Sequence, residues 1–128
     1  MSVKQAVDDL SRTIKALSWV SQVREVDGDP GGAYSVYLLP NDVAVNRNVT
    51  QIKSHLYAME LRLVVSGKAA TASNIFTRQK ALEDAIEDDR RRSGNAQDTY
   101  MGETWELAEE TENGFMSYSI PVFMNINN

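Results

Sequence analysis

The stretch that decides the fold is HLYAMELRLVV, residues 55–65, because its apolar and polar side chains alternate over most of its length. A period of two residues is the pattern of a β-strand with one face on a core. Glu60 and Arg62 occupy the polar face. The other face is apolar apart from a histidine, and it comprises His55, Tyr57, Met59, Leu61, Leu63 and Val65. The stretch therefore predicts a long strand packed on one side against another layer.

Two more strands are predicted before it. VSQVREV, residues 20–26, and AYSVYLLP, residues 33–40, are rich in strand-forming residues, and the turn formers of DGDPGGA, residues 27–33, separate them. Pro40 cannot donate to a sheet ladder, so it should end its strand or lie at an edge. Residues 41–54 are polar, Asn-rich and weakly patterned. We expect them to form a long connecting arm without a core of its own.

Two helices are predicted from apolar residues that recur with a 3.6-residue period. The first lies near the N-terminus, and its apolar stripe consists of Val3, Val7, Leu10, Ile14 and Leu17. The second follows the long strand, and the face it turns to the sheet consists of Ile75, Gln79, Leu82 and Ile86. One of Thr71, Ser73 or Asn74 should cap the second helix, because their side chains can accept from its free N–H groups.

A hairpin should close the chain. TYMGETWELAEE, residues 99–110, and GFMSYSIPVFMNI, residues 114–126, flank Asn113-Gly114, a strong hairpin signal. Pro121 in the last strand indicates an edge or a bulge, where another subunit could add, and Phe123 breaks the polar face. For Trp105 we keep two readings open, core packing and an interface anchor. The inward face of the last strand should consist of Met116, Tyr118, Ile120, Val122, Met124 and Ile126.

The predicted fold is a single α+β domain over residues 1–128. It has an N-terminal helix, an antiparallel or mixed sheet with a crossover helix packed on one face, and a closing hairpin. A chain of 128 residues is long enough for one core. The net charge of −5 argues against a nucleic-acid-holding protein, and the lack of cysteine excludes disulfides. The sequence shows no signal peptide or membrane span, so we expect no membrane partner and synthesis in the cytoplasm.

Metal and catalytic sites are weakly supported. Asp27 and Asp29 begin a stretch that suggests a calcium loop, but Pro30 follows the second acid, Gly31 stands where the third ligand belongs and Leu38 stands where a bidentate glutamate should close the site. His55 is the only histidine, so a zinc site or a hydrolytic centre would depend on one residue without a recognisable local signature. We expect no metal, no cofactor and no catalytic residues, and a hydrolytic enzyme in which His55 matters is the least favoured hypothesis.

The charged stretch IEDDRRRSG, residues 86–94, has two readings. As a helix end, it would pair Glu87 with Arg91 and Asp88 with Arg92 at i,i+4 spacing, and Gly94 would cap the helix. The arginines would also face the negative end of the helix dipole. As an interface, its acids would meet the arginines of a neighbouring copy. The residues concerned are Asp88, Asp89, Arg90, Arg91 and Arg92.

Residues 33–65 carry a family resemblance. AYSVYLLP, then an arm that contains Asn46, Val49 and Gln51, then LYAMELRLVV resembles the tail terminator (tail completion) proteins of long-tailed bacteriophages. The order of predicted elements agrees over nearly the whole chain. The charged end of the second helix departs from the hydrophobic end typical of that family. A neck or head-tail joining protein therefore stays open as an alternative, as does a small non-enzymatic regulatory module that binds another protein.

The resemblance implies a structural role in a virion. A homo-oligomeric ring, usually a hexamer, would sit on the end of the tail tube, stop its polymerisation and join the tail to the neck. The partners implied are the tube protein and a neck or head-completion protein, with DNA passing through the ring without sequence-specific binding and assembly in the host cytoplasm. Candidates for contact with the tube are Asn46, Arg47, Asn48 and Gln51. Candidates for contact between subunits are Asp88, Asp89, Arg90, Arg91, Arg92, Pro121 and Phe123.

Overall fold

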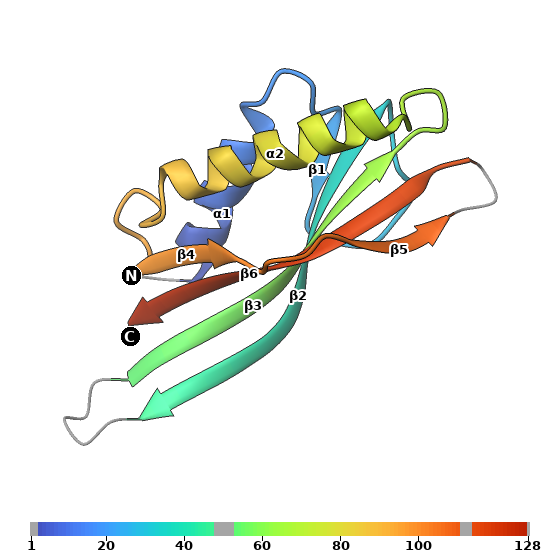
Figure 1. The fold of residues 1–128 in the computed structure, drawn as a ribbon. Coiled ribbons are helices and arrows are strands. Elements are labelled where there is room, and N and C mark those ends of the chain that lie inside the picture. Colours follow the sequence, from blue (N-terminus) through green and yellow to red (C-terminus); the bar gives the residue numbers. More distant parts are fainter. Residues whose placement is uncertain (1–2, 48–52, 111–113, 128) are drawn as a thin grey trace.

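The computed structural model describes residues 3–47, 53–110 and 114–127. Over these residues the chain forms two helices on one face of a six-stranded mixed sheet, which confirms the predicted α+β class (Figure 1). The helices are α1 (Val3–Lys15) and α2 (Ala72–Asp88). They pack on the sheet because each presents one apolar face to it.

The strand order is β1-β2-β3-β6-β4, and β5 also pairs with β6. Only the pairing of β1 with β2 is parallel among the described strands. Strand β6 pairs with β3 along one edge. Its other edge pairs with β4 near the C-terminal end of β6 and with β5 near the N-terminal end. The strands are β1 (Gln22–Arg24), β2 (Tyr34–Arg47), β3 (Lys53–Val65), β4 (Asp98–Met101), β5 (Glu106–Glu110) and β6 (Met116–Asn127).

The core lies between the helices and the sheet, and it confirms most of the predicted inward faces. Buried residues alternate with more exposed ones from Met59 to Leu63 in β3 and from Ile120 to Ile126 in β6, as a half-buried strand requires. The predicted sheet-facing side of α2 is buried in full, including Gln79. The fully or nearly buried residues on these elements are Ala6, Leu10, Ile14, Met59, Leu61, Leu63, Val65, Ile75, Leu82, Ile86, Ile120, Val122, Met124 and Ile126.

The predicted arm over residues 41–54 requires a correction. β2 continues to Arg47 and β3 begins at Lys53, and the two pair antiparallel from Val43↔Tyr57 to Arg47↔Lys53. Hydrogen bonds between backbone groups stabilise this extension of the two strands. Such bonds do not depend on apolar side chains, so the sequence pattern did not reveal them. Asn46 therefore lies in a strand, whereas Asn48 and Gln51 lie outside the described residues.

Pro40 does not end its strand, because a register shift between Pro40 and Val43 absorbs it. β1 pairs only with residues 35–37 of β2, so Pro40 lies on a free edge, as the edge alternative predicted. The penultimate predicted strand, residues 99–110, is instead two strands, β4 and β5, with an irregular link between them.

Candidate functional site

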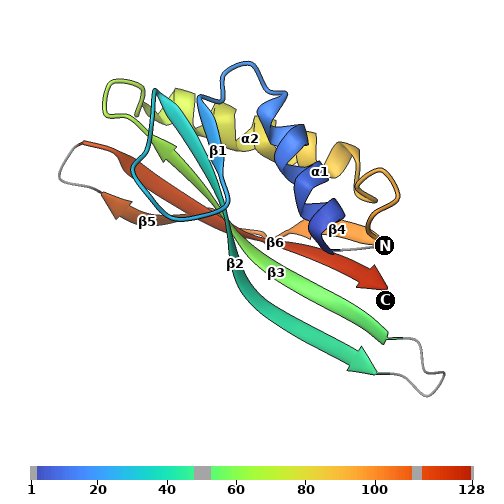
Figure 2. The ribbon, with the colours of Figure 1, turned by 180° about the vertical axis from the view of Figure 1, so that it is seen from behind.

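The sheet face away from the helices is divided into a covered and an open half (Figure 2). The loop between β1 and β2 covers one half. There Ser35 Oγ donates to the carbonyl oxygen of Gly31 at 2.7 Å, and the Tyr37 hydroxyl donates to that of Gly28 at 2.8 Å. Both side chains are buried although they point away from the core. No described element lies over the other half, which we call the open face.

Aromatic side chains stack on the open face. The rings of Tyr100 in β4 and Phe123 in β6 lie 5.2 Å apart at an interplanar angle of 28°. Tyr100 is 37% exposed, and Phe123 is half-buried and sits opposite Ala58 of β3. Pro121 lies two residues away on the same face and is exposed. The structure therefore brings together two of the predicted interface residues, Pro121 and Phe123, on one exposed surface.

Of the two alternatives predicted for Pro121, an edge or a bulge, the edge is wrong, because β6 has neighbours on both sides. Its carbonyl oxygen accepts from the Gly102 N–H at 2.8 Å, on the side of β4 and β5. In an extended strand the nitrogen of a residue points to the same side as its oxygen. The missing N–H of Pro121 thus faces the irregular link between β4 and β5, where no ladder bond is lost.

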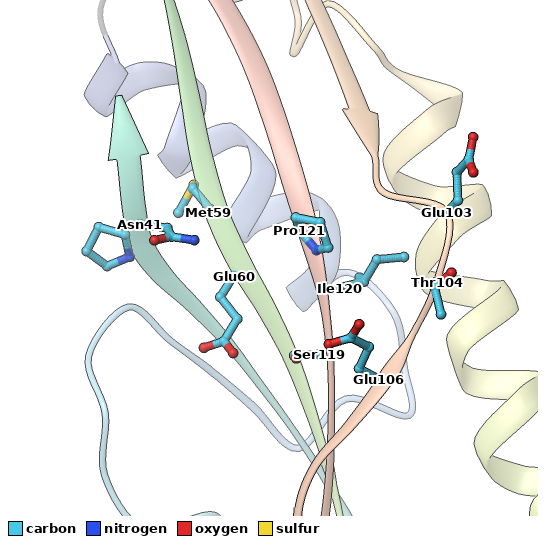
Figure 3. A pocket seen from close by; sticks show the side chains of 10 residues that line it. Asn41, Met59, Glu60, Glu103, Thr104, Glu106, Ser119, Ile120 and Pro121 are labelled. Atoms are coloured by element: carbon cyan, nitrogen blue, oxygen red, sulfur yellow. The ribbon is translucent and has the colours of Figure 1, made fainter. Parts of the chain in front are cut away.

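A hollow of about 610 Å³ crosses the open face from the β2 edge to the link between β4 and β5 (Figure 3). We call it the trough. Figure 3 shows the carboxylates of Glu60 and Glu106 on either side of Ser119. The small Ser119 side chain, the register shift after Pro40 and the break between β4 and β5 leave this space unfilled. The lining residues are Pro40, Asn41, Met59, Glu60, Glu103, Thr104, Glu106, Ser119, Ile120 and Pro121.

The charged side chains of the trough are acidic. The guanidinium of Arg62 lies 2.8 Å from the carboxylate of Glu60 and 3.7 Å from that of Asp27, so a single positive charge is shared between two carboxylates. Glu103 and Glu106 are exposed, and no ion pair joins either to a cation among the described residues. The trough therefore carries net negative charge and favours a basic partner.

The charged stretch after α2 does not form the predicted helix end. α2 ends at Asp88, and the next residues turn back on themselves. Arg90 binds Asp98 with two bonds, Nε–Oδ1 at 2.7 Å and Nη2–Oδ2 at 2.8 Å. This hydrogen bonding from Arg90 lowers the pKa of Asp98. Asp89 accepts from the Ser93 N–H at 2.8 Å, so it too is used within the chain.

Arg92 is buried, which removes it from the candidates for contact between copies. Its guanidinium donates to the carbonyl oxygens of Ile86 and Asp89 and lies 3.7 Å from Asp9 in α1. Burial lowers the pKa of the Arg92 guanidinium, with Asp89 and Asp9 opposing the shift. The predicted i,i+4 pair between Asp88 and Arg92 is therefore absent. Asp88 and Arg91 are exposed, and none of the ion pairs among the described residues includes either of them.

The two remaining aromatic candidates are accounted for by packing. Trp105 is half-buried against the core, and its Nε1 donates to Glu83 Oε1 in α2 at 2.9 Å, which supports the core reading. The ring of His55 stacks on that of Tyr57, with centroids 5.9 Å apart. Within the described part of the chain, no group of three or more His, Asp or Glu residues could hold a metal ion. No helix there is long and apolar enough to cross a membrane.

Sequence reasoning missed the trough. Its acids come from separate strands, Glu60 from β3 and Glu106 from β5, and only the register of β6 with both strands brings them together. Tyr100 was missed for the same reason, since its pairing with Phe123 follows from the register of β4. The signals in the sequence were Glu60 on the polar face of the long strand and Pro121 in the last strand, and both residues line the trough.

Comparisons with known proteins give a match in fold. No protein-family model and no curated protein matches the sequence. The structure is similar to 26 chains of solved structures. One of them is a chain of the structure "Virion of native gene transfer agent (GTA) particle", with a TM-score of 0.64 and 11% sequence identity. The match covers 96% of this chain and 92% of that chain, so the whole domain shares this fold.

Proposed function

We propose that this chain is a structural protein of a virion and, more specifically, a tail terminator. In this role a ring of copies, most simply six, sits on the end of a tail tube, stops its polymerisation and joins the tail to the neck. The observation that carries the proposal is the similarity in fold to a chain of a gene transfer agent virion over nearly the full length of both. The resemblance of residues 33–65 to tail terminator proteins supports the finer assignment.

The shape of the subunit suits a ring. A closed ring of identical copies needs two different surfaces on each copy that fit each other. The open face is one such surface. The paired ends of β2 and β3 extend away from both helices and provide a second, on a different part of the molecule (Figure 1). A subunit that offers a concave and a projecting surface can bind its neighbours in one direction around a ring.

The charge of the subunit is compatible with a DNA conduit. A basic bore would bind phosphates and oppose sliding, whereas this chain has a net charge of −5. The proposed role is non-enzymatic and requires no catalytic group, cofactor or metal. It places the protein in the virion after assembly in the host.

Assembly and tube capping test the proposal. The purified protein is examined by light scattering and by negative-stain microscopy, alone and with polymerising tail tube protein. We expect rings of several 14.3 kDa copies, formed alone or on tube ends, and tubes that stop lengthening. A neck protein would form rings without limiting tube length. A protein that stays monomeric in both conditions and leaves tube growth unchanged would contradict the tail terminator role.

A further inference from the structure

We propose that the trough of one copy binds the end of the β2–β3 hairpin of a second copy. This end consists of the described residues 43–47 and 53–57. The inference rests on the proposed ring and names the contact that builds it. It differs from the expectation that this part of the chain touches the tail tube.

Charge is the first argument. From residue 43 to residue 59 the sequence contains Arg47 and Lys53 and no Asp or Glu. Arg47 and Lys53 are partners in the β2–β3 register, so the two residues lie at the same end of the hairpin. The trough offers Glu103 and Glu106, which have no ion pair among the described residues. Opposite charges on two surfaces steer their association and fix its register.

Shape is the second argument. Two paired strands form a ribbon with a spacing of about 4.8 Å between its backbones. The trough spans the width of the sheet from β2 to the link between β4 and β5, and its volume is about 610 Å³. The rings of Pro40 and Pro121 give it apolar walls. The hairpin supplies an apolar counterpart, since Val43 is 54% exposed. A ribbon laid in the trough would cover this side chain.

Topology decides which copy provides the hairpin. The hairpin follows directly from the part of β2 that forms one wall of the trough, at Pro40 and Asn41. Its strands stay paired from Val43↔Tyr57 to Arg47↔Lys53, beyond the trough residues Asn41 and Met59 of the same copy. The hairpin cannot fold back without breaking this ladder. The occupant must therefore come from another copy, and such head-to-tail contacts close into rings when the rotation between copies permits it.

Charge reversal tests the contact. A trough variant, Glu103→Lys/Glu106→Lys, and a hairpin variant, Arg47→Glu/Lys53→Glu, are compared with the wild type by light scattering over a range of protein concentrations. We expect each variant to raise the concentration at half assembly by about tenfold or more. A chain that carries all four changes should assemble close to wild type, because the opposite charges are restored. A matched control, Lys15→Glu/Lys68→Glu, reverses two exposed cations outside the contact and should assemble as the wild type does.

The outcomes separate this inference from the proposed function. Circular dichroism establishes that each variant is folded, and Glu103→Gln/Glu106→Gln provides a milder trough variant that should weaken assembly in the same direction. If the hairpin variant forms normal rings but fails to cap tubes, the hairpin contacts the tube, so the inference is overturned and the proposed function stands. Normal assembly of the trough variants also overturns the inference. A wild-type protein that never assembles overturns both.

Discussion

The guanidinium of Arg92 lies 3.7 Å from the carboxylate of Asp9, and their side chains are 0% and 8% exposed. The pair joins the turn after α2 to the middle of α1. Arg92 also donates to the carbonyl oxygen of Ile86 at 2.5 Å and to Thr13 Oγ1 at 3.3 Å. A single cation thus connects the end of one helix with the side of the other, and it satisfies carbonyl groups that the helix end leaves without partners.

Replacing Arg92 should therefore destabilise the protein. Arg92→Ala removes the buried partner of Asp9 and leaves this carboxylate with Arg12 alone, whose exposed guanidinium lies 3.9 Å away. The loss should therefore approach the roughly 3–5 kcal/mol of a broken buried pair. Urea unfolding followed by circular dichroism measures the loss. The neighbouring exposed arginine provides the control, and Arg91→Ala should change the free energy of unfolding by no more than about 0.5 kcal/mol. Equal losses in the two variants would show that the buried pair is not what stabilises this turn.

The sequence predicted those parts of the fold that depend on local periodicity. The alternation in residues 55–65 identified β3 and its buried face, and the 3.6-residue spacing identified the buried side of α2 down to Gln79. These patterns predict structure well because a regular helix or strand turns every residue of one face to the core, so the apolar residues recur with the period of the element. The order of helices and strands followed from the same signals, with Asn113-Gly114 between the last two predicted strands.

What the sequence could not supply depends on contacts between distant segments. Arg92 reads as an exposed helix-end cation, and only the turn after Asp88 and the position of Asp9 show that it is buried. Residues 41–47 read as irregular, although their pairing with β3 makes them a strand. The trough depends on the register of β6 with β3 and β5. The apolar pattern of a single strand says little about its register with a distant strand when one face of the sheet is open to solvent.

The N-terminus of α2 offers a second prediction. Thr71 Oγ1 accepts from the N–H of Asn74 at 3.2 Å, so Thr71 is the residue that caps the helix among the predicted candidates. Thr71→Ala should lower the free energy of unfolding by about 1 kcal/mol. Ser73→Ala is the control, because Ser73 lies exposed within the helix and alanine favours helix. Thermal unfolding of both variants measures the difference, and a larger loss for Ser73→Ala would contradict the capping assignment.

The link between β4 and β5 is sensitive to side-chain size. A Cβ atom on Gly102 would lie 2.6 Å from Cγ of Pro121, too close for two carbon atoms. Gly102→Ala should therefore destabilise the fold by about 1–3 kcal/mol, the usual cost of overpacking. The double variant Gly102→Ala/Pro121→Ala removes the ring and should recover part of this loss. Chemical denaturation of the two single variants and the double variant gives the coupling energy, and strict additivity would exclude a direct clash.

The pair of Arg90 and Asp98 predicts a response to acid. The hydrogen bonds from Arg90 lower the pKa of Asp98 in the folded protein below its unfolded value of about 3.9. The unfolded state then binds the proton first, so this group stabilises the fold above pH 4 and loses that contribution as the pH falls through the lowered pKa. An NMR titration of the Asp98 carboxyl carbon should show its pKa rising toward the ordinary value in Arg90→Ala. The pKa of Asp98 should stay lower in Arg91→Ala than in Arg90→Ala. Equal rises of this pKa in the two variants would contradict the pairing of Arg90 with Asp98.

The aromatic pair on the open face predicts which layer of the subunit makes contacts in an assembly. Phe123 stacks on Tyr100 beside the trough, whereas Phe76 lies in α2, in the layer on the opposite side of the sheet, and is 67% exposed. If the open face is buried between copies, Phe123→Ala should weaken assembly by about 2 kcal/mol or more, roughly thirtyfold in concentration. Phe76→Ala removes an equal side chain and should leave assembly unchanged. Light scattering at matched concentrations compares the two, after circular dichroism has established that both are folded. A protein in which Phe76→Ala weakens assembly and Phe123→Ala does not would use its helix layer, and not the open face, to bind its neighbours.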